Sequence, residues 1–150
     1  PLRKKWTLIL KNKIGYGDSY GSTKELPFFR NFFAGGPRTV RGYGESSLGP
    51  EDIFGRALGG NILLTGNAEV IVPVPLLEDI KSARVSVFYD VGNVFASDDS
   101  FSLSELRMAV GVAGIWMSPM GLLSVSYSNP FNDKFGDEIE KFQFNFGTQF

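Results

Sequence analysis

Residues Lys141 to Phe150 read Lys-Phe-Gln-Phe-Asn-Phe-Gly-Thr-Gln-Phe. Phenylalanine occupies every second position as far as Phe146 and returns at Phe150, while polar residues or glycine fill the positions between. A period of two is typical of a β-strand with one apolar and one polar face, because successive side chains of a strand point to opposite sides. This stretch therefore predicts a strand that lies between two different environments.

The same alternation runs backwards through the chain in five further stretches. They are Leu122–Ser128, Glu105–Met117, Ser82–Phe95, Gly60–Val74 and Lys4–Tyr16. No segment has sustained helical spacing with capping residues. The sequence therefore predicts an all-β chain of about six strands.

Two classes of fold contain strands of this kind. In a water-soluble sandwich the apolar faces turn inward, and the alternation alone fits that class. Three features favour a membrane barrel: strands of about ten residues, aromatic residues near strand ends, and connections that differ systematically in length. Ser118 to Gly121 is a tight turn, whereas Gly17 to Arg56 and Asn129 to Glu140 are long. We therefore predict an antiparallel transmembrane β-barrel segment, with both chain ends on the side of the tight turn.

Composition limits the chemistry that this chain can perform. Its 150 residues suit one domain, and 15 basic against 16 acidic residues leave no broad basic surface for nucleic acid. The chain has no cysteine and no histidine, which excludes a thiolate metal site and a nucleophile activated by histidine. The acidic residues between Asp133 and Glu138 lack calcium-loop spacing and are interpreted as solvated. We therefore predict no enzyme, no metal site and no cofactor.

The connection at about 17–56 is roughly forty residues long, far beyond the usual length between packed elements. Its centre, Gly35 to Gly49, reads Gly-Gly-Pro-Arg-Thr-Val-Arg-Gly-Tyr-Gly-Glu-Ser-Ser-Leu-Gly. Disordered segments are poor in aromatic residues, whereas this connection carries several. We therefore predict a folded loop that docks into a polar cavity enclosed by the strands.

Glu69 and Asp90 are acidic residues on the polar faces of two neighbouring predicted strands. A guanidinium held in a partly dehydrated cavity needs carboxylates to offset the loss of hydration. Arg41 of the loop is thus predicted to bridge Glu69 and Asp90. The alternative is that Arg41 is a solvated loop residue and that the two acids line a wet pore.

Several motifs carry a specific family resemblance. Phe32–Gly36, Thr39–Tyr43, Tyr89–Phe95, Trp116–Gly121 and a last strand closing on Phe150 occur in an order that resembles the C-terminal part of the BamA family, within the bacterial surface antigen superfamily. The resemblance implies that residues 1–150 are the C-terminal portion of an outer-membrane β-barrel preceded by periplasmic domains. It also implies that a long external loop folds back into the lumen. The residues that match its docking motif are Val40, Arg41, Gly42 and Tyr43.

The resemblance further implies a function in the cell outer membrane, with both ends of this segment in the periplasm. BamA-like proteins assemble and insert other β-barrels through a lateral seam at the terminal strand, here marked by Asn145, Gly147 and Phe150. The implied partners are unfolded outer-membrane protein clients, outer-membrane lipid, and accessory lipoproteins bound through the absent periplasmic domains.

Two alternatives to assembly stay open: a secretion or translocation pore of the same superfamily, and a passive porin. The open edges of six strands also predict that the isolated fragment self-associates, because an unpaired strand edge binds other strands.

Overall fold

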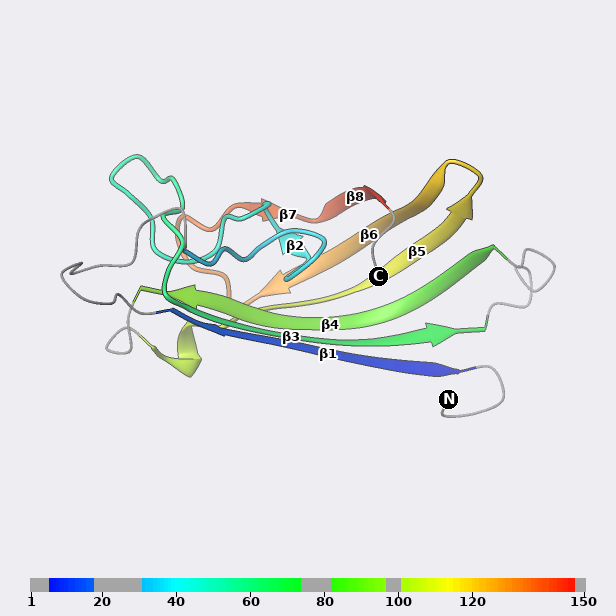
Figure 1. Ribbon diagram of the computed structural model, residues 1–150, viewed down its shortest axis with the longest axis horizontal. Coiled ribbons are helices and arrows are strands. Elements are labelled where there is room, and N and C mark those ends of the chain that lie inside the picture. Colours follow the sequence, from blue (N-terminus) through cyan, green and yellow to red (C-terminus); the bar gives the residue numbers. More distant parts are fainter. Residues whose placement is uncertain (1–5, 18–30, 74–81, 97–100, 148–150) are drawn as a thin grey trace.

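The computed structural model describes residues 6–17, 31–73, 82–96 and 101–147. Six antiparallel strands form one curved sheet in the order β1-β3-β4-β5-β6-β8 (Figure 1). Their bounds are β1 Thr7–Tyr16, β3 Ile62–Val72, β4 Ala83–Phe95, β5 Arg107–Ser118, β6 Gly121–Phe131 and β8 Phe142–Gly147. The predicted all-β, antiparallel arrangement of about six strands is therefore confirmed.

Three local features differ from the expectation. β6 continues past Ser128 to Phe131 because it still pairs with β5 there. β8 pairs with β6 only as far as Tyr127, so the proline at position 130 interrupts no pairing with β8. Within the expected Asn129–Glu140 connection, β7 (Ile139–Glu140) pairs with β2 (Gly42–Tyr43). A short 3₁₀ turn, η4 (Leu103–Glu105), precedes β5.

No helix in the described part of the chain is both long enough and apolar enough to cross a membrane.

The two faces of the sheet have opposite character. Large apolar side chains on the convex face are exposed, including Leu10, Ile14, Val87, Tyr89, Val112, Trp116, Tyr127, Phe142, Phe144 and Phe146. Side chains on the concave face are buried and mostly polar or small, including Thr65, Ser86, Asp90, Ala109, Ala113, Ser126, Ser128 and Gln143. A water-soluble sandwich would bury the apolar face, so this distribution is that of a barrel wall with lipid outside.

The apolar core lies between the long loop and the concave face, rather than between two sheets. Its loop residues are Ala34, Val40, Tyr43 and Leu48, and its sheet residues are Leu63, Val94 and Ala109. Figure 1 shows the loop and β2 lying within the curve of the sheet. The loop thus supplies the inner layer against which one end of the wall packs.

β1 and β8 are the outer strands of the six-stranded sheet in the described part of the chain. β8 is described over six residues, up to Gly147, and the other five strands of this sheet have 10 to 13. The tight turn joins β5 and β6, with Ser118 opposite Gly121. By register, β1 begins and β8 ends on the side of this turn, and the long loop lies on the other side.

Candidate functional site

The motif Val40–Tyr43 lies where the loop contacts the concave face. Val40 and Tyr43 are completely buried, and the motif places Arg41 over β3 and β4. Gly42 has φ +93°, and a Cβ atom there would lie 3.0 Å from Ser128 Oγ. Both the left-handed backbone and the close approach of β6 favour glycine at this position.

Arg41 makes a forked contact with Asp90. Its Nε lies 2.7 Å from Asp90 Oδ2 and its Nη2 lies 2.9 Å from Oδ1, while the backbone N–H of Arg41 also donates to Oδ2 at 3.1 Å. Arg41 Nη1 donates to Glu69 Oε2 at 3.2 Å. The Asp90 side chain is 0% exposed and that of Arg41 is 11% exposed. The structure thus brings together the three charged residues singled out from the sequence.

Two further residues complete the surroundings of Arg41. The Phe88 ring lies under the guanidinium, with its centroid 3.4 Å from Arg41 Cζ, and the Ser86 hydroxyl donates to Glu69. Burial alone would lower the pKa of Arg41, but the hydrogen bonds and charges of Asp90 and Glu69 outweigh it and raise that pKa. The guanidinium therefore stays charged and fixed in orientation.

The backbone of the motif binds a different part of the chain. Gly42 N–H donates to Gln143 Oε1 at 3.2 Å, and Gln143 Nε2 donates to the Tyr43 carbonyl at 2.6 Å. Gly44 N–H donates to the Glu138 carbonyl at 2.8 Å, next to the β2–β7 pairing. Gln143 is a residue that sequence reasoning missed. The sequence signal that could have found it is its position on the polar face of the last predicted strand.

Tyr43 extends across the loop end of the β5–β6 hairpin. Its hydroxyl lies 3.1 Å from the Met108 carbonyl and 3.2 Å from the Phe131 carbonyl, and it can donate to one of them at a time. Burial, together with the charge of Asp137, raises the pKa of Tyr43 to about 12. The phenol is therefore a neutral donor at physiological pH.

A second buried ion pair, which sequence reasoning missed, holds the connection between β6 and β7. Arg107 donates from Nε and Nη2 to Asp137 at 2.5 and 3.0 Å, and the two side chains are 10% and 7% exposed. The expectation that the acidic residues of this connection are solvated is therefore wrong for Asp137. The polar parity of Arg107 in its strand was the signal that could have found this pair.

Two of the three predicted seam residues, Asn145 and Gly147, lie on β8. Asn145 is paired with Ser124 and Gly147 with Leu122, and both are partly exposed on the concave side. Asn145 faces a cavity of about 260 Å³ that Arg41 and Gln143 also line. Phe150 lies outside the described residues.

A curved antiparallel sheet that is apolar outside, polar inside and filled by its own docked loop defines a segment of a transmembrane β-barrel. The chain matches the Omp85 superfamily domain over residues 1–150 and belongs to that superfamily.

Solved and curated relatives agree with this assignment. The chain is 38% identical to the outer membrane protein assembly factor BamA of Neisseria meningitidis serogroup B, covering 100% of this chain and 22% of that protein. It is 33% identical to the crystal structure of BamA from Haemophilus ducreyi lacking POTRA domains 1–3, with a TM-score of 0.87, covering 96% of this chain and 32% of that one. The resemblance to BamA predicted from the motifs is confirmed.

A more distant relative is the sorting assembly machinery 50 kDa subunit of Saccharomyces cerevisiae, at 28% identity over 92% of this chain and 31% of that protein. The first curated relatives are much longer than this chain, which spans about a fifth of their length.

Proposed function

We propose that residues 1–150 are the C-terminal portion of an outer-membrane β-barrel assembly factor. The observation that carries this proposal is the 38% identity to a BamA along the whole of the chain. The relatives named as assembly factors or as sorting assembly machinery support assembly over the two pore alternatives.

The terminal strand supplies the proposed working surface. A strand edge within a bilayer leaves backbone N–H and C=O groups without partners, so it readily binds another strand. We propose that the edge of β8 that does not face β6, around Asn145 and Gly147, opens at a seam and receives strands of a client barrel. Phe150, the third predicted seam residue, belongs to this proposal by the family resemblance. The proposed mechanism involves no cofactor and no covalent chemistry. The protein lowers the free-energy barrier to insertion of the client into the membrane.

Gly147 suits such an edge. A Cβ atom added to Gly147 would meet nothing within 4 Å, so its small size is not required by packing inside the described sheet. A position without a side chain stabilises the pairing of a strand less than a β-branched or aromatic residue does. We therefore propose that Gly147 keeps the end of β8 weakly held.

The docked loop supplies the proposed internal anchor. Arg41, fixed by Asp90 and Glu69, attaches the motif to the wall, and the apolar core around Val40 and Tyr43 excludes water from the contact. Such an anchor keeps the wall near the seam rigid while the edge itself changes partners.

The proposed setting is the cell outer membrane, with the side of the tight turn in the periplasm. Short turns lie on the periplasmic side of outer-membrane barrels, and β1 begins and β8 ends on that side here. The proposed partners are unfolded outer-membrane protein clients, outer-membrane lipid, and accessory lipoproteins that bind periplasmic domains outside this chain.

The function is tested with the full-length parent protein reconstituted in vesicles of outer-membrane phospholipid. An unfolded client barrel is added, and its folding is followed by protease protection, with empty vesicles and vesicles that hold a porin as controls. An assembly factor accelerates client folding above both controls. Transfer of a soluble polypeptide into the vesicle lumen, or solute flux alone, without faster client folding would instead support a secretion pore or a porin.

A further inference from the structure

The Val-Arg-Gly-Tyr segment binds two separate parts of the wall at once. The Arg41 side chain bonds to Glu69 on β3 and Asp90 on β4, and Asn67 Nδ2 on β3 donates to the Thr39 carbonyl at 2.6 Å. Directly after Arg41, the backbone of Gly42 and Tyr43 bonds to Gln143 on β8. The segment thus crosses the concave face from β3 and β4 to the terminal strand.

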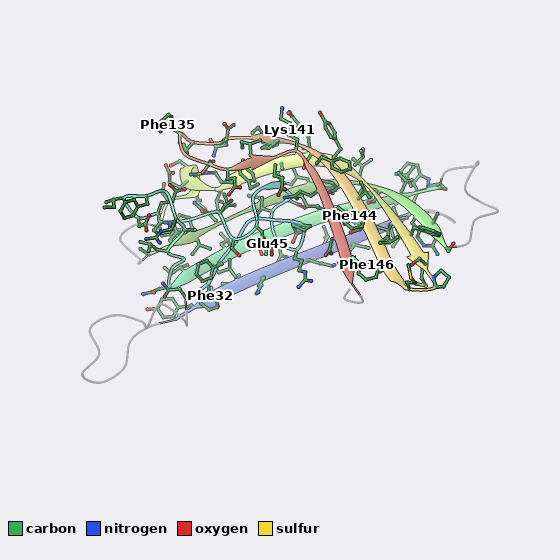
Figure 2. The ribbon with its side chains drawn as sticks, turned by 90° about the horizontal axis from the view of Figure 1, so that it is seen from above. Phe32, Glu45, Phe135, Lys141, Phe144 and Phe146 are labelled. Carbon is green, nitrogen blue, oxygen red and sulfur yellow. The ribbon has the colours of Figure 1, made fainter. Side chains whose placement is uncertain are left out.

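This contact gives the terminal strand β8 a further attachment to the wall. The described part of β8, Phe142–Gly147, pairs with β6, and its other edge has no partner within the described part of the chain. Figure 2 shows Phe144 and Phe146 along this outer strand, and both side chains are more than half exposed. Neither side chain packs β8 against the interior, so β8 is held to the wall by its pairing with β6 and by the contacts of its inward side chains.

Gln143 is the inward contact that the structure provides. Its side chain is 3% exposed, and it both accepts from the motif through Oε1 and donates to it through Nε2. A primary amide can make this pair of bonds because it carries an acceptor and a donor on one planar group. Leucine fills a similar volume and can make neither bond.

We infer that the docked motif positions the terminal strand, and that Gln143 is the positioning residue that couples loop docking to the edge of β8. The functional importance of this coupling rests on the proposed function, because the edge of β8 is the proposed seam. Loop docking and the position of β8 are then coupled, and such coupling is reciprocal. A substitution that releases the motif should loosen β8, and a substitution that removes the Gln143 contact should loosen the motif.

The test is hydrogen exchange of the full-length parent in lipid nanodiscs, measured by mass spectrometry without any client. Three variants are compared with the wild type: Arg41→Met, Gln143→Leu and the outward control Phe144→Leu. We expect Arg41→Met to accelerate exchange of the amides of residues 142–147 roughly tenfold, the change produced by losing about one buried hydrogen bond from the strand. Gln143→Leu should accelerate exchange of residues 40–44, and Phe144→Leu should leave residues 40–44 unchanged.

Arg41 is the decisive position, because it bonds to β3 and β4 and reaches β8 only through the loop. Unchanged exchange of residues 142–147 in Arg41→Met would overturn the inference, whether or not the loop itself is released. If Arg41→Met does not fold, unchanged exchange of residues 40–44 in Gln143→Leu overturns it equally. Exchange is measured without a client, so it reports the coupling independently of whether the parent assembles barrels.

Discussion

Replacing Arg41 with methionine removes the central charge of the docked loop and leaves Asp90 without its main partner. The Asp90 carboxylate is 0% exposed and is held by three bonds from Arg41, two from the guanidinium and one from the backbone N–H. Methionine keeps much of the length of the side chain, so the change mainly affects charge and hydrogen bonding. Breaking a buried pair in this way costs about 3–5 kcal/mol of unfolding free energy.

The double variant Arg41→Met/Asp90→Asn isolates the reason for that cost. Asparagine removes the stranded charge, so the double variant should regain about 1–3 kcal/mol relative to Arg41→Met alone. The two substitutions are therefore expected to be strongly non-additive, as is usual for residues in contact. Arg56→Met is the matched control, because Arg56 is an exposed loop arginine whose pairing with Asp52 lies at the surface.

These free energies are measured on the full-length parent in detergent micelles, by guanidinium titration followed by tryptophan fluorescence. Arg56→Met should unfold at the same denaturant concentration as the wild type. A cost of less than about 1 kcal/mol for Arg41→Met, the value for a solvated surface pair, would contradict a buried ion pair. A double variant in which Asp90→Asn adds its full cost to that of Arg41→Met would contradict it as well.

Three other substitutions test separate contacts by the same titration. Arg107→Met should cost about 3–5 kcal/mol, because it strands a buried carboxylate in the connection after β6, and a cost near zero would show that this pair is solvated. Tyr43→Phe keeps the ring but removes the hydroxyl donor, so we expect a loss of about 0.5–1.5 kcal/mol; an unchanged stability would mean that the hydroxyl contributes nothing net. Gly111→Ala should cost about 1–3 kcal/mol, since its Cβ would clash with the Tyr127 carbonyl and would lie 2.5 Å from the Phe88 ring. Gly114→Ala on the same strand is its control, because nothing lies within 4 Å of that added atom, and equal costs for the two would contradict the packing argument.

The strands of the barrel wall could be predicted from the sequence because each strand separates two environments. The alternation from Lys141 onward, like that of the other strands, arises because one face of the strand meets lipid and the other meets a polar interior. The positions of the strands can therefore be predicted from it. Glu69 and Asp90 could be singled out for the same reason, as charges on the inward parity of neighbouring strands. Their contact with Arg41 followed from the need of a dehydrated guanidinium for carboxylates.

The contacts that could not be predicted join segments far apart in the chain without a period of their own. β2 and β7 are two residues each, too short for any alternation to appear. Gln143 looks like any other inward polar residue until the loop backbone is placed beside it. Arg107 and Asp137 are 30 residues apart, and nothing in the acidic connection distinguishes Asp137 from its solvated neighbours. These contacts depend on where the tertiary fold places the long loop and the connection between β6 and β7.

The most direct test of the account is the initial rate at which the full-length parent assembles a client barrel in vesicles when its loop anchor is removed but its fold is kept. Arg41→Met/Asp90→Asn serves this purpose because it leaves no charge at the fully buried position 90. It is compared with the wild type and Arg56→Met at equal amounts of folded, inserted parent. We predict that client assembly falls well below the wild-type rate in the double variant and stays at the wild-type rate in Arg56→Met. Equal rates for all three proteins would contradict the claim that the docked loop is part of the assembly machinery.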